Sequence, residues 1–189
     1  MTARFTGGVV LETPRLALEP LTRAHAAEMF EALADPELYT YLPLSLPESV
    51  EALAERYARL ARGYPDTEDE LWLNWVVRDR ATGAAIGHVQ ATIYEDLTAD
   101  LTCVLAAGSW GRGFASEALR AALGELWGRH GVERVEIALD NRNLRGALVA
   151  ERLGFSVVDV REARDYHTAR PTSEVLLALT RPAGTRVRG

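Results

Sequence analysis

Hydrophobic and polar positions follow two rhythms along this chain, and their order predicts the fold class. Apolar residues alternate with polar ones over 15–21, 71–77, 85–93, 100–106, 132–139, 156–161 and 173–179, the period of a strand with one buried face. They recur at helical spacing between Thr22 and Asp35 and over about 48–62, 115–130 and 144–153. Two early helices, a meander and then alternating strands and helices predict an α/β fold. We expect a mixed, mostly antiparallel sheet of about six or seven strands with helices on both faces.

The same pattern predicts one domain. The 189 residues are enough for one substantial core, and no composition shift marks a boundary. Residues 1–10 read as an N-terminal arm, 11–180 as the domain, and 181–189, rich in Arg, Pro and Gly, as a flexible tail.

One short stretch offers a binding site for anions. A predicted strand ends near Leu105, residues 110–117 read Trp-Gly-Arg-Gly-Phe-Ala-Ser-Glu, and an amphipathic helix follows. Gly111 and Gly113 allow backbone conformations closed to other residues, and Ser116 is a candidate helix cap. The first N–H groups of a helix lack internal partners and carry partial positive charge, so this stretch predicts a phosphate site. An ordinary strand-to-helix turn is the alternative. The motif lacks the Lys of a Walker loop and the third Gly of a dinucleotide fingerprint.

Composition narrows the function classes. The net charge of −6 argues against nonspecific nucleic-acid binding, which needs basic patches. All 21 basic residues are arginine, so a lysine Schiff base is excluded. Cys103 is the single cysteine, and the four histidines show no metal spacing, so we expect no internal disulfide and no metal. No signal peptide or membrane-spanning run is visible, and we expect a cytoplasmic protein without a membrane partner.

Three segments together resemble a known family. They are Glu12-Thr13-Pro14-Arg15-Leu16, the run from Ala99 to Leu119, and the run from Asn143 to Phe155. Their order and motifs resemble the GNAT superfamily of acetyl-CoA-dependent N-acetyltransferases. Within it they are most similar to the branch of the RimJ and RimL ribosomal-protein N-terminal acetyltransferases. The resemblance covers roughly residues 11–180.

The resemblance implies acetyl-CoA as cosubstrate and a role for each matching position. The backbone amides that would wrap the CoA pyrophosphate are those of Gly111, Arg112, Gly113, Phe114, Ala115 and Ser116. The pantetheine arm would pair with backbone groups of Cys103, Val104 and Leu105, where the family's strands splay, and with Asn143. One strand amide would stabilise the oxyanion that forms on the acetyl carbon.

Two of the positions that depart from the family pattern bear on the helix cap and the general acid. Gly146 stands where the family usually has a Ser that supports the helix cap, so we expect a weaker cap. Ala150 stands where many members have a Tyr that protonates the departing thiolate, so the resemblance does not identify the general acid.

The catalytic candidates are therefore drawn from neighbouring positions. Asp100 lies on the central strand where the branch often has Glu, and it is our candidate base. His88 on the preceding strand could face the cleft, and Tyr166 precedes the last strand, where family members often line the acceptor pocket. Further candidates are Glu95, Asp96, Glu136 and His167. Cys103 reads as a small core residue, because no basic partner stands near it.

Several acceptors fit the predicted reaction, which is direct attack of a neutral amine on the thioester. A protein or peptide N-terminus is the first choice, because an α-amine with pKa near 8 is roughly one-tenth neutral at pH 7. A small amine is the main competitor: a polyamine, an aminoglycoside or an amino-acid derivative. The acidic loop at 66–70 would favour a cationic acceptor if it borders the cleft. A module that binds acyl-CoA without turnover is the third interpretation, and pairing into a homodimer is compatible with such a sheet.

Overall fold

The computed structural model describes residues 8–43, 45–64 and 70–185. The strands are β1 (Leu11–Glu12), β2 (Leu16–Pro20), β3 (Glu70–Asp79), β4 (Ala85–Tyr94), β5 (Thr98–Leu105), β6 (Arg134–Asp140), β7 (Ser156–Arg164) and β8 (Pro171–Thr180). The α-helices are α1 (Ala26–Ala32), α2 (Val50–Leu60), α3 (Phe114–Gly128) and α4 (Leu144–Leu153). Short 3₁₀ helices are η1 (Arg23–His25), η2 (Pro36–Tyr39) and η3 (Ala107–Ser109).

The strands form one mixed sheet in the order β1-β2-β3-β4-β5-β6-β8-β7. Every neighbouring pair is antiparallel except β5 and β6, which are parallel. The predicted α/β class and mixed sheet are confirmed. The sheet has eight strands rather than six or seven, because the two-residue β1 pairs with β2. Two residues are too few for a periodic signal in the sequence.

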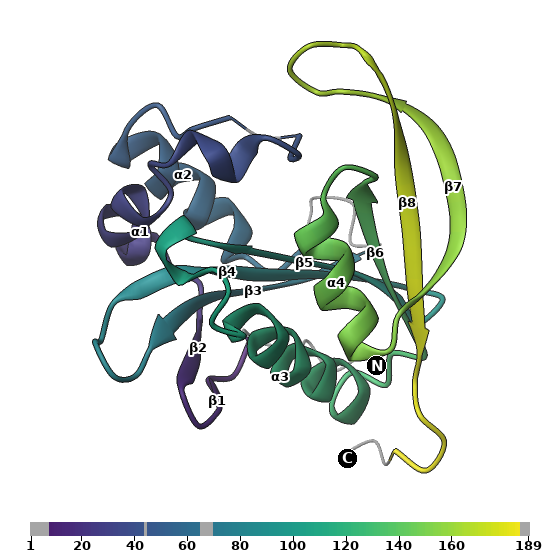
Figure 1. Ribbon diagram of the computed structural model, residues 1–189. Coiled ribbons are helices and arrows are strands. Elements are labelled where there is room, and N and C mark those ends of the chain that lie inside the picture. Colours follow the sequence, from purple (N-terminus) through teal and green to yellow (C-terminus); the bar gives the residue numbers. More distant parts are fainter. Residues whose placement is uncertain (1–7, 44, 65–69, 186–189) are drawn as a thin grey trace.

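Helices cover both faces of this twisted sheet (Figure 1). One core joins α3 and α4 to the sheet through residues such as Leu101, Leu119 and Val135, all almost fully buried. The second core joins α1 and α2 to the other face through Met29, Tyr57, Val76 and Val104, among others. Alternate strand residues serve the two cores, which is why the strands read as alternating in sequence.

A charged cluster fixes α1 against the sheet edge. Arg78 on β3 donates hydrogen bonds to both carboxylate oxygens of Glu19 on β2 and of Glu28 on α1, at 2.8–2.9 Å. The hydrogen bonds from Arg78 lower the pKa of each glutamate, although burial opposes the shift. Before this helix, Thr22 closes a capping box with His25 and starts η1, which runs directly into α1.

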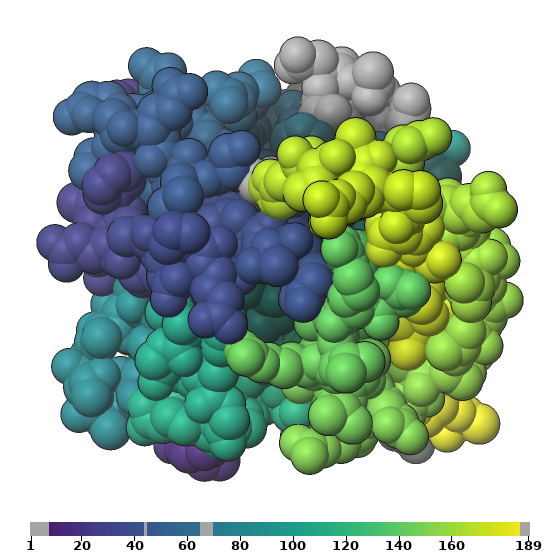
Figure 2. Space-filling view, turned by 45° about the horizontal axis from the view of Figure 1, so that its top comes forward, coloured from purple at the N-terminus to yellow at the C-terminus, as the bar shows by residue number. Residues whose placement is uncertain are grey.

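The β7–β8 hairpin extends beyond the sheet and returns over the α2 side of the molecule (Figure 1). Nε2 of His167 in its turn lies 2.8 Å from the carbonyl oxygen of Tyr39 in η2. Figure 2 shows this yellow-green turn lying against the dark blue segment that contains η2, with a hollow between that segment and the green α4. The turn of the hairpin therefore contacts η2, which lies between α1 and α2 in the chain.

Some sequence expectations fall on residues outside the described ranges. Residues 1–7 of the arm, most of the acidic loop at 66–70 and residues 186–189 of the tail belong to this group. In the described part of the arm, the carbonyl of Val9 accepts a hydrogen bond from the Trp75 indole at 3.0 Å. In the described part of the tail, the backbone N–H of Arg181 donates to the carbonyl of Glu133. Among the described residues, no helix is long and apolar enough to cross a membrane.

Candidate active site

The two parallel strands at the centre of the sheet separate towards their C-terminal ends. β5 and β6 pair only from Thr98/Arg134 to Asp100/Glu136, although β5 continues to Leu105. On its other side β5 stays paired with β4, and the N–H of Ala106 still donates to Ile86. Because pairing alternates along a strand, Cys103 and Leu105 turn their backbone groups away from β4, towards the gap that β6 leaves. This is an open strand edge inside the sheet.

The predicted phosphate loop lies between that edge and α3. Gly111 and Gly113 have φ of 74° and 78°, the left-handed region that favours glycine. Gly113 is the N-cap of α3 and makes no side-chain cap, so the N–H groups of Phe114, Ala115 and Ser116 have no capping acceptor. The expected cap by Ser116 is wrong, because the helix begins at Phe114 and Ser116 lies within its first turn. The uncapped helix end faces solvent, since residues 111–113 are exposed.

An arginine from the first strands holds this loop in place. The Arg15 side chain donates to Glu117 at 2.6 Å and to the carbonyl of Arg112 at 2.9 Å, and Thr13 donates to Glu117 at 2.6 Å. Burial raises the pKa of Glu117, but the hydrogen bonds from Thr13 and Arg15 outweigh it, and the net shift is downward. The guanidinium groups of Arg15 and Arg112 lie 4.8 and 4.4 Å from the centre of the Phe114 ring. The uncapped N–H groups thus lie beside two cations.

The Trp110 side chain connects the loop to the open strand edge through a hydrogen bond. Its indole N–H donates to the carbonyl of Leu105 at 2.8 Å, and the Arg145 guanidinium stacks 4.2 Å from its ring. This leaves the N–H of Leu105 and both backbone groups of Cys103 facing the gap. The Cys103 side chain packs against the α3 core, and burial raises the pKa of its thiol to about 12. The backbone groups of Cys103 thus face the gap, and its protonated, buried thiol is not a nucleophile.

Asn143 begins α4 beside the same gap. Its side-chain oxygen accepts a hydrogen bond from the N–H of Gly146 at 2.9 Å. A Cβ at position 146 would lie 2.9 Å from the Asn143 amide nitrogen, so a larger residue there would require the Asn143 side chain to shift. The N-cap of α4 is thus present without a serine, and Asn143 itself provides it. The Asn143 amide keeps its N–H groups as donors, while its oxygen serves the helix.

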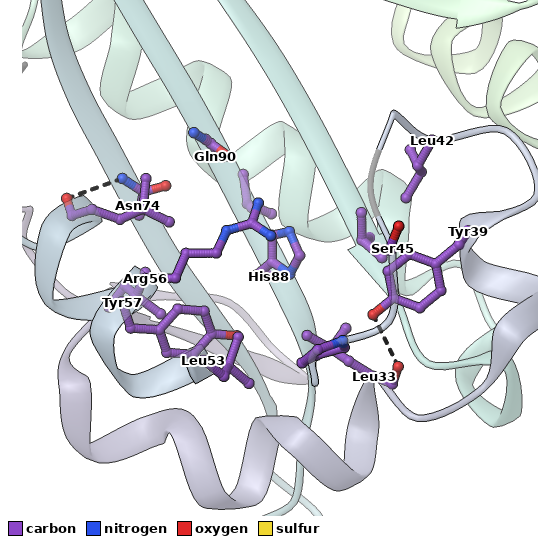
Figure 3. Close-up of a pocket in the computed structure, with 15 residues that line it drawn as sticks. Leu33, Tyr39, Leu42, Ser45, Leu53, Arg56, Tyr57, Asn74, His88 and Gln90 are labelled. Carbon is purple, nitrogen blue, oxygen red and sulfur yellow. Dashed lines mark hydrogen bonds between the residues drawn. The ribbon is translucent and has the colours of Figure 1, made fainter. Parts of the chain in front are cut away.

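A pocket lies on the α1 and α2 side of the open strand (Figure 3). Its volume is about 30 Å³, and Val104 of β5 forms part of its wall. The remaining lining residues are Leu21, Leu33, Tyr39, Leu42, Ser45, Pro47, Leu53, Arg56, Tyr57, Leu60, Asn74, His88, Val89 and Gln90. Most of them are apolar, and no described lining residue is a carboxylic acid. A polar acceptor here would contact a small set of groups from α2, β3 and β4.

Of the three catalytic candidates, the structure brings only His88 to this pocket. His88 pairs with Val104 across β4 and β5. Burial, and second the nearby Arg56 cation, lower its pKa to about 4, so the imidazole is neutral at pH 7. Its Nδ1 is buried and has no hydrogen-bond partner among the described residues.

Asp100 and Tyr166 lie elsewhere. Asp100 is exposed, accepts a hydrogen bond from the Tyr94 hydroxyl at 2.7 Å, and precedes Val104 by about 13 Å of strand. Tyr166 is 53% exposed in the β7–β8 turn and is not a lining residue of the pocket. Neither residue is brought together with His88.

The sequence interpretation missed the polar groups that α2 and β3 bring to the pocket, namely Arg56, Tyr57 and Asn74. Tyr57 lies at the spacing of the apolar face of α2, and it is 4% exposed. Nothing in the sequence marks these residues, because they meet His88 only when α2 packs on the sheet. Among the described residues, no group of three His, Cys, Asp or Glu side chains is placed to hold a metal.

The family resemblance implies this arrangement, in which an open strand edge is followed by a glycine loop and an uncapped helix. A match to a family model shows which family the chain belongs to. The model described as "Acetyltransferase (GNAT) domain" matches residues 15–156. The chain belongs to the GNAT acetyltransferase family. It is therefore an acetyltransferase, and the family's acetyl donor is acetyl-CoA.

Similar proteins extend over nearly the whole chain. "Uncharacterized N-acetyltransferase YoaA" of Bacillus subtilis (strain 168) is 22% identical over 175 residues, which is 92% of this chain and 97% of that protein. The structure of a ribosomal-protein-S5-alanine acetyltransferase from Vibrio fischeri matches with a TM-score of 0.81 at 17% identity, covering 93% of this chain and 98% of that one. A spermidine N-acetyltransferase from Vibrio cholerae, in complex with CoA and spermine, matches with a TM-score of 0.75 at 19% identity, covering 89% and 96%. These likenesses support the fold.

Proposed function

We propose that this protein acetylates the α-amino group of a protein or peptide N-terminus. The observation that carries the proposal is the weak basicity of the pocket beside the open strand. Its described lining holds no carboxylate, and its imidazole, His88, has a pKa of about 4. Such a pocket suits an amine that is already neutral in a useful fraction of molecules.

The difference between amine classes is large at pH 7. An α-amine with pKa near 8 is neutral in roughly one molecule in ten, whereas an alkyl amine near 10.4 is neutral in fewer than about one in a thousand. A polyamine or lysine side chain therefore needs a strong base close to the reacting nitrogen. The described pocket provides none, and its arginine disfavours a polycation. Among these acceptors, the α-amine has the least need of a base in the lining of the pocket.

The chain's own groups can then be given roles in the reaction. Backbone N–H groups on the open edge of β5 would stabilise negative charge on the thioester oxygen when the amine attacks. The uncapped N–H groups of Phe114, Ala115 and Ser116, with Gly111, Arg112 and Gly113, would hold the pyrophosphate. The neutral Nδ1 of His88 would accept a hydrogen bond from the amine and orient its lone pair. Val104 would separate the pantetheine path from the acceptor pocket.

Two roles stay with the residues that the sequence suggested. Asp100 is proposed to receive the proton that the amine loses, through water, since it lies along the same strand as Val104. Tyr166 is proposed as proton donor to the departing thiolate, by movement of the turn that carries it. The Asn143 amide would donate to the pantetheine. Each role is separable by a single substitution that leaves the uncapped helix end unchanged.

The structural neighbours include both acceptor classes. One neighbour is named as a putative ribosomal-protein-serine acetyltransferase and another as a ribosomal-protein-S5-alanine acetyltransferase. A third is named as a spermidine N-acetyltransferase. The first two support an assignment to the RimJ/RimL-like branch, and the lining of the pocket is our reason to prefer it.

Thiol release from acetyl-CoA tests the proposal against matched acceptors. The panel contains a peptide with a free N-terminus, the same peptide with a blocked N-terminus and an internal lysine, a polyamine, an aminoglycoside and amino acids. We expect release with the free N-terminus and little with the blocked peptide. Faster release with the polyamine or aminoglycoside would contradict the α-amine assignment. Binding of acetyl-CoA with no release from any acceptor would favour the non-catalytic alternative.

A further inference from the structure

Arg56 places a positive charge in the acceptor pocket without a matching negative charge. It projects from α2, and Figure 3 shows its guanidinium beside the His88 imidazole, pointing over β4. No carboxylate in the described parts of the chain lies within ion-pair distance of it. Arg15, Arg78 and Arg142, by contrast, each have such a partner. Arg56 therefore differs from them in having its partner position open.

Two more polar atoms in the same pocket are unpartnered. The Tyr57 hydroxyl and Nδ1 of His88 are both buried and have no hydrogen-bond partner among the described residues. Buried polar atoms are usually paired, because leaving one unpaired costs free energy. A cation, a hydroxyl donor and a ring-nitrogen acceptor thus converge from α2 and β4 on one small space. A ligand with a carboxylate and an amine supplies partners of the right kind for all three.

The charge of Arg56 reaches across the pocket. It is the second cause, after burial, of the lowered pKa of His88. Burial raises the pKa of Tyr39 and Tyr57, and the Arg56 cation opposes the shift in both. The guanidinium therefore lies near His88, Tyr39 and Tyr57.

The phosphates of the donor are not the natural partner of Arg56. The helix end that would hold them belongs to α3, whereas α2 lies on the opposite face of the sheet. Arg15 and Arg112 already supply positive charge at that helix end. Arg56 is thus left for the acceptor.

We propose that Arg56 binds a carboxylate of the acceptor, so that the preferred substrate is an α-amine with a carboxylate close by. This inference rests on the proposed function and narrows it. Two sources have this chemistry: a peptide whose first residue is Asp or Glu, and a free amino acid. The Tyr57 hydroxyl would donate to the same carboxylate, and His88 would accept from the amine. The cavity of about 30 Å³ suits a group of carboxylate size.

Paired acceptors isolate the carboxylate. One pair is a peptide beginning with Asp and the same peptide beginning with Asn; the other is a free amino acid and its amide. For the wild type we expect kcat/KM to favour the carboxylate member by roughly 10- to 100-fold, the size of a charge-assisted hydrogen bond. Whichever pair shows the larger ratio identifies the source.

The variants test whether Arg56 is responsible. Arg56→Gln should remove the preference mainly through KM, and Arg56→Lys should restore part of it. Arg59→Gln is the matched control, because Arg59 lies on the same helix, is exposed and is not a lining residue. An Arg56→Gln variant that keeps the preference, or a wild type without one, would overturn the inference.

Failure of the proposed function is distinguishable from failure of this inference. Turnover of α-amines without a carboxylate preference leaves the function standing and removes the role of Arg56. If no acceptor is turned over, calorimetric titration of the CoA-loaded protein with the Asp and Asn peptides decides. Tighter binding of the Asp peptide that Arg56→Gln abolishes supports the inference, and equal binding of the two peptides overturns it.

Discussion

The glycine before α3 offers a quantitative test of the phosphate site. Gly113 has φ of 78° and ψ of 7°. This left-handed residue is the last of the loop and the N-cap of α3. A Cβ at this position would meet only Nη2 of Arg15, at 3.5 Å, which is an ordinary contact. Packing therefore does not forbid a side chain there. The backbone conformation does, and so does the space that the phosphates would occupy.

The expected size of the effect follows from those two terms. A left-handed non-glycine residue costs about 1–2 kcal/mol, so Gly113→Val should lower the melting temperature by about 2–8 °C for a chain of this length. If the chain escapes this cost by changing the loop, the N–H groups of Phe114 to Ser116 move. Losing one charge-assisted hydrogen bond of about 1.5–3 kcal/mol raises the Kd for acetyl-CoA by roughly 10- to 150-fold.

Calorimetric titration with acetyl-CoA measures this effect, and Gly124→Ala is the control. Gly124 lies inside α3, and a Cβ there would meet nothing within 4 Å. Alanine should stabilise the helix by about 0.5–1 kcal/mol and leave the Kd unchanged. A folded Gly113→Val protein whose Kd stays within about twofold of the wild type would refute the placement of the phosphates, since a shift of 1.5 kcal/mol exceeds tenfold.

Three further predictions concern the strands and the charged cluster. Gly87→Ala should lower the free energy of unfolding in urea by about 3 kcal/mol, because a Cβ would overlap the Val104 carbonyl oxygen and lie 2.8 Å from Leu105 Cα; normal stability would contradict this. If Asp100 receives the proton, Asp100→Asn should lower kcat by about 10²-fold with an unchanged Kd for acetyl-CoA, and an unaltered kcat removes that role. The two glutamates that bind Arg78 have lowered pKa values in the folded state, so they stabilise it above about pH 4.3 and this stability is lost as the pH falls through the folded pKa values. Acid titration of Arg78→Met should show a shallower loss than the wild type, and parallel curves would contradict the assignment.

The fold and the glycine loop before α3 could be predicted from the sequence because their signals are local. The glycines at 111 and 113, the helix after them and the strand before them are contiguous, and the structure places them as a loop at an uncapped helix end. The two-residue β1 and the N-cap at Gly113 escaped prediction, since neither has a periodic pattern. Ser116 looked like a cap because serine favours that position, but φ of the preceding glycine decided where the helix starts.

The acceptor side could not be predicted because it is built from distant segments. Arg56 and Tyr57 lie on α2 and His88 lies on β4, and the whole of β3 separates them in the sequence. They come together only when α2 packs on the sheet. Asp100 lies on β5, the strand that the family resemblance gives to the cofactor, yet it is far from the pocket, because the four residues from Asp100 to Val104 span about 13 Å. Tyr166 precedes the last strand in sequence, but the long β7–β8 hairpin carries it beyond the sheet and away from the pocket lining.

The position of the acetyl group on a peptide with two amines tests the central claim most directly. The peptide carries a free N-terminal Asp and one internal lysine, and it is incubated with acetyl-CoA and the purified protein at pH 7. Fragment masses then locate the acetyl group. Our account predicts that acetylation occurs at the α-amine and that the lysine is unmodified. Acetylation at the lysine, with a free N-terminus, would contradict it.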